Sequence, residues 1–319
     1  ASAVFNSRGE AIARLKNFEE DFQIVDPDAD MPALEIPYQN KTVNVYRAIR
    51  LGLRDYFEKN GFRTACLGLS GGIDSAVVVS LAAEVLGPEN VRVLLMPSQF
   101  SSDHSVEDAR TLAENLGVQY QIVPINETFA ALTTTLGPVF GELPFDTTEE
   151  NMQARIRGMM MLAISNKFGN MLLATSNKSE IAVGYGTLYG DTVGALGIIG
   201  DLYKCEVYDL ARYINRNEEI IPLNTIMKAP SAELRLEQKD SDSLPPYDIL
   251  DAILYRMIEE GQSREEIINA GFDEEVVYKV YGLVVKSEFK RYQARPTLRL
   301  SSRPLLTGRR MPLTNKYGY

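Results

Sequence analysis

The residues with the clearest chemical potential form one short stretch, Ser70-Gly71-Gly72-Ile73-Asp74-Ser75. An apolar run precedes it at 62–69 and another follows at 76–83, so the pattern predicts a strand, a tight glycine loop and a helix. Glycines let the backbone approach a ligand closely, and the unpaired N–H groups at a helix start favour an anion. Asp74 would repel a phosphate unless a Mg²⁺ ion lay between them. The loop therefore predicts a site for a polyphosphate and a metal ion.

Other interpretations of this loop can be weighed from the sequence. The simplest is a turn between two elements that binds nothing. The P-loop pattern G-x-x-x-x-G-K-[ST] is absent. Gly68, Ser70 and Gly72 fit the G-x-S-x-G elbow of α/β-hydrolases, which also requires a histidine after the last acid. The single histidine, His104, comes early in the chain, and this position disfavours a serine hydrolase.

Length and composition limit the class of protein. The 319 residues suffice for one large or two modest domains, and the net charge of −10 argues against a nucleic-acid partner. No apolar run is long enough to span a bilayer and no signal peptide is recognisable, so we expect a cytoplasmic protein without a membrane partner. Two cysteines, Cys66 and Cys205, are too few for a zinc site, and we expect free thiols in a reducing compartment.

Strands and helices are expected to alternate through the middle of the chain. The predicted strands are 62–69, 91–96, 119–124 and 171–174, and the predicted helices are 43–60, 73–86, 105–117 and 147–169. This alternation is typical of a doubly wound, parallel α/β sheet, which binds ligands at the carboxyl ends of its strands. Extra C-terminal helices are predicted at 206–216, 247–260, 263–270 and 273–291.

The first residues have a different pattern. Residues 2–15 predict two short strands around an Asn-Ser-Arg-Gly turn, residues 18–26 predict another edge strand, and an acidic, proline-punctuated linker follows. A lone hairpin is only marginally stable in water. We therefore divide the chain into strands of a larger upstream domain with their linker (1–30) and one main domain (31–319).

This fold places further polar residues near the glycine loop. Asn151 and Arg155 lie one turn apart on the 147–169 helix, which is otherwise apolar and expected to be largely buried. Glu180 follows the 171–174 strand. It is therefore expected on the same rim as Asp74, where two carboxylates could share a metal ion.

Three other segments stand out by composition. The glycine-rich segment 184–197 is expected to be a mobile lid, and 227–246 is expected to be a second flexible loop. Residues 286–310 are basic in an otherwise acidic chain. They predict either a solvated surface or a site for a substrate with several negative charges.

Four segments together resemble the NAD synthetase family of N-type ATP pyrophosphatases, and in particular the synthetase domain of its glutamine-dependent members. They are the glycine loop, Asn151-Met152-Gln153-Ala154-Arg155-Ile156-Arg157, Thr175-x4-Glu180 with Tyr189-Gly190-Asp191, and Lys286-Ser287-Glu288-Phe289-Lys290-Arg291. The resemblance covers about residues 40–319. Residues 1–26 resemble the last strands of a nitrilase-like glutaminase domain, without its Cys, Glu and Lys. The chain is therefore expected to be a C-terminal portion that uses ammonia and not glutamine.

The resemblance implies ATP-dependent synthesis of NAD. In this family the nicotinate carboxylate of deamido-NAD attacks the α-phosphate of ATP, and pyrophosphate leaves. Ammonia then displaces AMP from the acyl adenylate and forms the amide. An anion that attacks a polyanion requires charge neutralisation and alignment. Mg²⁺ and a homodimer or higher homo-oligomer are implied as well.

The same resemblance assigns roles to individual residues. The implied ATP-binding residues are Ser70, Gly71, Gly72, Asp74, Ser75, Thr175, Lys204 and Ser231. The implied deamido-NAD-binding residues are Asn151, Arg155, Glu180, Phe289 and Lys290, of which the last two could come from the other subunit. Asp74 and Glu180 are implied as Mg²⁺ ligands. Asp191, Asp74 and Lys204 are implied as catalytic, and Asp191 is expected to orient ammonia or accept a proton.

The sequence departs from the family at several positions. Thr192, Val193 and Ala195 stand where ammonia-dependent relatives carry Gly-Gly and a second Asp. Leu95 and Leu162 replace an Arg on the adenine side and a ring-stacking Tyr. These changes concern the adenine and nicotinate contacts and leave the ATP loop intact. Two alternatives stay open beside the hydrolase, namely a GMP or asparagine synthetase module with the same loop and a nucleotide-binding module without chemistry.

Overall fold

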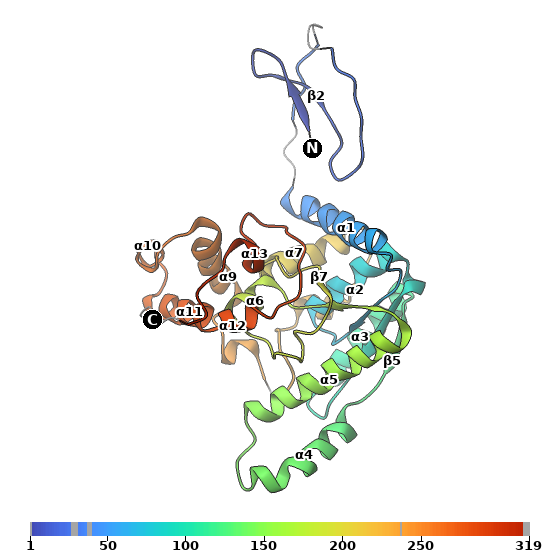
Figure 1. The fold of residues 1–319 in the computed structure, drawn as a ribbon, viewed down its shortest axis with the longest axis vertical. Helices are drawn as coiled ribbons and strands as arrows, with labels where there is room; N and C mark the ends of the chain where they lie inside the picture. Colours follow the sequence, from blue (N-terminus) through green and yellow to red (C-terminus); the bar gives the residue numbers. More distant parts are fainter. Residues whose placement is uncertain (1, 27–30, 37–39, 237, 315–319) are drawn as a thin grey trace.

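The computed structural model describes residues 2–26, 31–36, 40–236 and 238–314. An antiparallel hairpin of β1 (Ala3–Phe5) and β2 (Ala11–Arg14) stands apart from the main body (Figure 1). The strand predicted at 18–26 is wrong, because these residues form no strand and expose Phe22 and Ile24 by 82% and 84%. An extended segment forms a strand only beside a partner. The predicted linker lies partly outside the described residues.

A five-stranded parallel sheet in the order β5-β4-β3-β6-β7 forms the centre of the main body. Its strands are β3 (Ala65–Gly68), β4 (Val91–Leu95), β5 (Gln119–Ile122), β6 (Met171–Ala174) and β7 (Leu196–Gly197). The predicted parallel α/β sheet is therefore confirmed. β7 was not predicted, since two residues are too few to carry a pattern. The chain order reverses beside β3, which creates a crevice at the carboxyl ends of β3 and β6.

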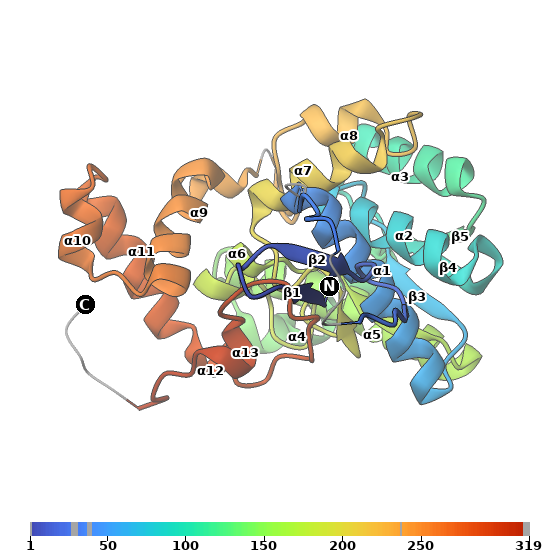
Figure 2. The ribbon, with the colours of Figure 1, turned by 90° about the horizontal axis from the view of Figure 1, so that it is seen from above.

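Helices cover both faces of this sheet (Figure 2). On one face pack α1 (Lys41–Asn60), α2 (Ile73–Leu86), α3 (Asp103–Leu116) and α7 (Lys204–Ile214), around the largest core. The opposite face packs on α5 (Thr147–Phe168). Successive residues of β3 alternate between the two cores, with Leu67 in the first and Cys66 in the second. This burial on both faces explains why the strands read as continuous apolar runs.

The helices predicted over 247–291, together with a short helix at 305–308 that was not predicted, form a second core beside α6 (Lys178–Val183). They are α9 (Tyr247–Tyr255), which continues as a π-helical turn (Arg256–Glu260), α10 (Arg264–Asn269), α11 (Glu274–Lys286), α12 (Glu288–Arg291) and α13 (Leu305–Gly308). The helix predicted over 273–291 is interrupted at Ser287, whose hydroxyl donates to the Val183 carbonyl 2.8 Å away. None of the helices in the described part of the chain has the length and apolar character needed to cross a membrane.

Two helices differ from expectation. α3 begins at Asp103 and is capped by Ser102, whose hydroxyl accepts from the Ser105 N–H. α4 (Asn126–Phe140) was not predicted, and the structure buries none of its residues. It projects from the sheet with the first turns of α5 (Figure 1). α5 is less buried than predicted, with Met159 59% exposed.

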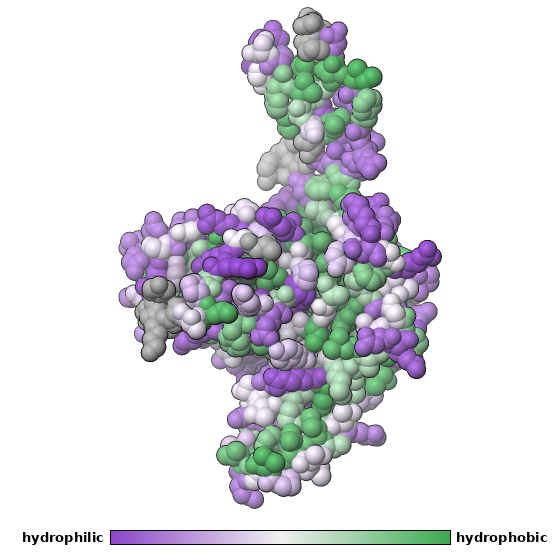
Figure 3. All heavy atoms as spheres, viewed as in Figure 1, coloured by the Kyte–Doolittle hydropathy of each residue, from purple (hydrophilic) through white to green (hydrophobic). Residues whose placement is uncertain are grey.

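The remaining short elements are α8 (Leu223–Met227) and two 3₁₀ turns (Pro88–Asn90 and Asp240–Asp242). Apolar side chains gather on the surface of the projecting hairpin and around α4 (Figure 3). On the hairpin side, Phe5 is 56% exposed, and beyond α4, Leu143 is 76% exposed.

Candidate active site

The glycine loop connects the carboxyl end of β3 to α2, as predicted. The Ser75 hydroxyl donates to the Gly72 carbonyl at 3.0 Å, and its oxygen lies 3.2 Å from that of Ser70. Gly71 has φ +78°, and a Cβ there would lie 2.2 Å from the backbone oxygen of Ser105 in α3. A side chain at this position would collide with backbone, so the loop requires glycine. The result is a tight turn pressed against the first turn of α3.

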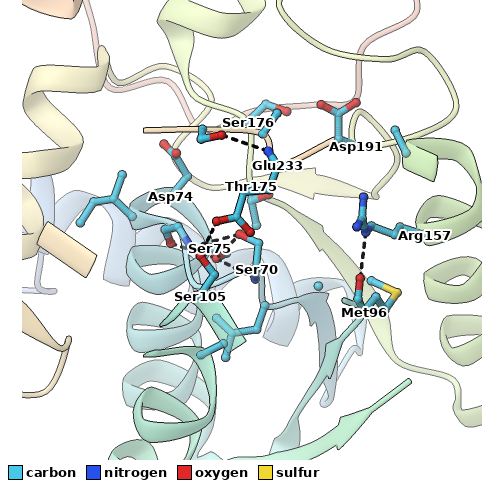
Figure 4. Close-up of a pocket in the computed structure, with 18 of the residues that line it drawn as sticks. Ser70, Asp74, Ser75, Met96, Ser105, Arg157, Thr175, Ser176, Asp191 and Glu233 are labelled. Atoms are coloured by element: carbon cyan, nitrogen blue, oxygen red, sulfur yellow. Dashed lines mark hydrogen bonds between the residues drawn. The ribbon is translucent and has the colours of Figure 1, made fainter. Parts of the chain in front are cut away.

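A cavity of about 320 Å³ opens beside this loop, at the carboxyl ends of β3, β4 and β6 (Figure 4). Most residues predicted for the site line it: Ser70, Gly72, Asp74, Ser75, Thr175, Glu180, Asp191, Lys204 and Ser231. Gly71 does not line the cavity, because it faces α3. Figure 4 shows the serines of the loop at one end of the cavity and Asp191 with Arg157 at the other.

Lys204 joins the two carboxylates of the predicted metal site. Its Nζ lies 2.5 Å from Asp74 Oδ2 and 3.3 Å from Glu180 Oε1. Burial alone would lower the pKa of Lys204, but the two carboxylates outweigh burial and raise it above its usual value. Burial, together with the neighbouring Asp74 and Asp240, raises the pKa of Glu180. The three side chains form one desolvated ionic cluster at the rim of the cavity.

Asn177 fixes the positions of both acids. Its side-chain amide donates to Asp74 Oδ1 at 2.8 Å, and its side-chain oxygen accepts from the Glu180 N–H at 3.0 Å. The residue is fully buried and caps α6. Although it lies in the segment Thr175-x4-Glu180, its role was not predicted, because the contact spans 103 residues of sequence.

Asp191 stands alone among the predicted catalytic residues. Its carboxylate opens to the cavity and accepts from the Thr187 N–H at 2.6 Å. Although Asp191 is exposed, the protein around its carboxyl group partly desolvates it and raises its pKa, against the opposing effect of backbone hydrogen bonds and of Arg295 and Lys290. A carboxylate with a raised pKa is better able to accept a proton near neutral pH.

Four residues predicted to bind the dinucleotide do not line the cavity. Three of them hold the glycine-rich segment 184–197. Asn151 Oδ1 accepts from the Thr187 hydroxyl at 2.6 Å, Arg155 Nε donates to the Leu188 carbonyl at 3.2 Å, and Lys290 Nζ donates to the Gly184 and Gly186 carbonyls at 2.7 Å each. Phe289 is 51% exposed. The segment predicted as a mobile lid is thus fastened at several points in this structure.

The cavity also contains polar residues that were not predicted as site residues. Arg157 donates to the Met96 carbonyl at 3.0 Å, and burial lowers its pKa to about 10. Lys228 lies 3.1 Å from the Ser105 hydroxyl, and Glu233 contacts the same hydroxyl at 2.7 Å. Arg157 belongs to a segment whose resemblance was noted, so its sequence position carried a signal. Nothing in the local pattern distinguishes Lys228 or Glu233 from other polar loop residues.

The donor set near the glycine loop fits Mg²⁺ and not a softer metal. Among the described residues, no group of three or more His, Cys, Asp or Glu side chains could hold a metal ion. Two carboxylates are a common protein contribution to Mg²⁺, whose other ligands are water and phosphate oxygens. Asp74 and Glu180 supply such a pair, although one oxygen of each also contacts the Lys204 ammonium. His104 is exposed on α3 and makes no hydrogen bond to Ser70, so the hydrolase arrangement is absent from the described residues.

A comparison with protein families tests the resemblance to a known family. The family model described as NAD synthase matches residues 45–294. The chain belongs to the NAD synthase family. This confirms the resemblance found from the glycine loop and the three other segments. A glutamine-dependent NAD(+) synthetase from Synechocystis is 49% identical over 99% of this chain and 58% of its own length. Another from Acinetobacter baylyi is 44% identical over 99% of this chain and 59% of its own length.

Solved structures agree with this assignment. A glutamine-dependent NAD⁺ synthetase from Acinetobacter baumannii, in complex with adenosine diphosphate, is 41% identical with a TM-score of 0.67, over 97% of this chain and 57% of its own. An NH3-dependent NAD synthetase from Campylobacter jejuni is 30% identical with a TM-score of 0.63, over 78% of this chain and 95% of its own. The chain therefore spans less than three fifths of the length of the glutamine-dependent relatives named above.

Proposed function

We propose that this chain catalyses the ATP-dependent amidation of deamido-NAD to NAD, with release of AMP and pyrophosphate. Ammonia is the nitrogen donor for this portion, and glutamine supplies it in the full-length protein. The observation that carries the proposal is the glycine loop on the same cavity as the Lys204, Asp74 and Glu180 cluster. A cavity with these groups suits a reaction in which pyrophosphate is the leaving group.

The leaving pyrophosphate would bind at the glycine loop. Ser70, Ser75 and the first residues of α2 line the cavity, and their N–H and hydroxyl groups would donate to phosphate oxygens once the Ser75 hydroxyl leaves the Gly72 carbonyl. Lys204 would add a positive charge near the α-phosphate, with Thr175 and Ser231 as further ATP contacts. Asp74 and Glu180 would hold Mg²⁺, which when bound supplies neutralisation of the phosphate charge.

The reaction would then proceed in two displacements. The nicotinate carboxylate forms a bond to the α-phosphorus as the bond to pyrophosphate breaks, and this gives the acyl adenylate. Ammonia attacks the acyl carbon, AMP leaves with the bonding electron pair, and the nitrogen loses a proton. Asp191 lies in the cavity with a raised pKa and would accept that proton or orient the ammonia.

The dinucleotide would bind where the glycine-rich segment meets α5 and α12. Asn151 and Arg155 reach this segment from α5, and Lys290 reaches it from α12. Exposed Phe289 could meet the substrate from a neighbouring subunit. Glu180 would bind the substrate from the cavity side. The cationic side chains now bonded to carbonyls would then exchange these partners for substrate oxygens.

Two partner surfaces accompany this function. The exposed apolar side chains of the hairpin would pack on an upstream glutaminase domain, with residues 1–30 as its remnant and 31–319 as the synthetase domain. The apolar surface around α4 and the start of α5 would join two copies in a homodimer or higher homo-oligomer. Cys66 and Cys205 are free thiols, which suits a reducing cytoplasm.

One assay tests the proposed function. The chain is supplied with ATP, Mg²⁺ and ammonia, and with deamido-NAD, xanthosine monophosphate, aspartate or nicotinate mononucleotide as the acid. We expect AMP, pyrophosphate and NAD with deamido-NAD, and no product when glutamine replaces ammonia. The mononucleotide is included because an NMN synthetase from Francisella tularensis is 26% identical with a TM-score of 0.68. ADP and orthophosphate as products, or selective use of another acid, would refute the proposal.

A single variant ties this activity to the cavity. Asp74→Ala removes one of the two carboxylates at the glycine loop and should abolish Mg²⁺-dependent turnover without unfolding the chain. Normal turnover by this variant would contradict the metal assignment, and tight ATP binding without turnover by the unmodified chain would indicate a binding module instead.

A further inference from the structure

The carboxylate of Glu233 is held at the first turn of α3. Its Oε1 accepts from the Ser102 hydroxyl at 2.9 Å and from the Ser105 hydroxyl at 2.7 Å, and its Oε2 accepts from the Ser102 N–H at 3.2 Å. Glu233 belongs to residues 228–236, a segment here named the strap, and lies 128 residues from Ser105 in the sequence. The Glu233 carboxylate therefore accepts hydrogen bonds from one N–H and two hydroxyls, and these donors would also suit the oxyanion of a ligand.

The first turn of α3, where the Glu233 carboxylate is held, adjoins the glycine loop. The Gly71 position approaches the Ser105 backbone so closely that a Cβ would lie 2.2 Å from its oxygen. Ser70, Ser75, Ser105 and Glu233 all line the same cavity. Figure 4 shows these four residues grouped at one end of it. A polyphosphate bound at the glycine loop would thus meet the Glu233 carboxylate.

The charge of the cavity makes this encounter unfavourable. Among the described residues that line it, the acids outnumber the bases: Asp74, Glu180, Asp191, Glu233 and Asp240 against Arg157, Lys204 and Lys228. Asp74 and Asp191 accept hydrogen bonds from Asn177 and the Thr187 N–H. Glu233 differs because it reaches the cavity from the strap. Lys228, the first residue of the strap, is held by Asp108 Oδ2 at 3.0 Å and lies 3.1 Å from the Ser105 hydroxyl. If Lys228 keeps this ion pair, departure of Glu233 would leave two hydroxyls and a paired cation beside the glycine loop.

The same strap conformation also engages Ser231, a proposed ATP contact. The Ser231 hydroxyl donates to the Gln238 carbonyl at 2.5 Å and accepts from the Glu233 N–H at 3.1 Å. Glu233 itself has φ +49°, which is costly for a residue with a Cβ. One rearrangement of the strap would therefore release both the carboxylate from α3 and the Ser231 hydroxyl for a ligand.

We propose that Glu233 sets the affinity of this protein for ATP: in the free protein its carboxylate occupies part of the space for the polyphosphate, and it must leave before the nucleotide binds. The inference rests on the proposed function, because it takes the glycine loop as the polyphosphate site. Glu233 is a positioning residue in this scheme, since it acts on binding and not on the reacting atoms.

The test compares equilibrium binding of two probes, inorganic pyrophosphate and ATP with Mg²⁺, by titration calorimetry of the whole chain. Glu233→Gln keeps the size of the side chain and removes its charge. We expect the variant to bind both probes about tenfold more tightly, because a nearby like charge is removed from a poorly solvated site. Glu233→Ala should act in the same direction and serves if the Gln variant does not fold.

Glu107→Gln is the matched control. Glu107 lies on α3 and pairs with Arg110, so this variant removes one negative charge close to the helix that Glu233 contacts, without touching the cavity. The control should bind as the unmodified chain does. If that chain binds ATP and both Glu233 variants bind it equally or more weakly, the inference is wrong and the proposed function stands. If none of these proteins binds either probe, the proposed function fails and the inference fails with it.

Discussion

Lys204 and Asp74 are 130 residues apart in the sequence, yet the Lys204 ammonium lies 2.5 Å from Asp74 Oδ2. Lys204 is the first residue of α7, and Asp74 lies in the first turn of α2. The Lys204 side chain is only 3% exposed, so its charge depends on this carboxylate and on Glu180 for compensation. The pair therefore joins the first turns of α7 and α2 at the glycine loop. A change to either residue is expected to affect both the stability of the fold and the proposed reaction.

Replacing Lys204 should affect both stability and activity. Lys204→Met leaves two carboxylates facing each other without a cation, and we expect the free energy of unfolding to fall by about 3 kcal/mol. AMP formation should be lost. Urea unfolding and an AMP assay measure the two effects. Lys204→Arg keeps the charge and should retain most of the stability, so equal losses in both variants would contradict an electrostatic role.

The glycine loop should not tolerate a side chain at residue 71. Gly71→Ala places a Cβ 2.2 Å from the Ser105 oxygen and keeps φ at +78°. We expect a loss of about 3 kcal/mol and no measurable ATP binding. Gly117→Ala is the control, because its φ is +68° and nothing lies within 4 Å of the added carbon. That change should lower the free energy of unfolding by only about 1 kcal/mol, which is the cost of the left-handed backbone conformation for a residue with a Cβ. Similar losses in the two variants would show that the contact with Ser105 is unimportant.

The buried Lys178 predicts a dependence of stability on pH. Its Nζ lies 2.5 Å from Glu259 Oε1 and 3.0 Å from Asp201 Oδ1, and the side chain is fully buried. Burial alone would raise the pKa of Glu259. The hydrogen bonds from Lys178 and Ser302 outweigh this effect, so the pKa lies below its ordinary value of 4.5. The stabilisation is thus present above that pH and is lost as the pH falls through the lowered pKa.

Glu259→Gln isolates this effect. The melting temperature of the variant should lie well below that of the unmodified chain at pH 7, and the difference should shrink as the pH falls below about 4.5. Melting curves from pH 3 to 7 measure it. A difference that stays constant over this range would mean that Glu259 stabilises the fold through packing and not through its charge.

Lys290 should control the order of the glycine-rich segment. Lys290→Met removes the donor to the Gly184 and Gly186 carbonyls, each 2.7 Å away. Because hydrogen bonds from charged groups contribute about 1.5–3 kcal/mol each, amide hydrogens of 184–197 should exchange faster, and the KM for deamido-NAD should rise. Lys279→Met, at an exposed position of α11, should leave both unchanged. Unchanged exchange in the Lys290 variant would contradict this function of Lys290.

Some of the fold could be predicted because its signals are local. β3, β4 and β6 are short apolar runs that alternate with helices, and burial on both faces leaves that pattern in the sequence. α4 left no such pattern, since no residue of it is buried. The strand predicted at 18–26 failed because pairing depends on a partner, and no described strand lies beside these residues. Asn151, Arg155 and Lys290 were predicted from motifs, yet their contacts with the glycine-rich segment follow from packing alone.

The sequence by itself determined the glycine loop, the parallel sheet and the family, because glycine, apolar period and motif spacing act over a few residues. Only the tertiary structure decided that Lys204 lies between Asp74 and Glu180, and that Glu233 reaches across to the first turn of α3. Such contacts join residues more than twenty positions apart, and in most cases more than a hundred. Their geometry depends on how whole helices pack, which no local pattern encodes.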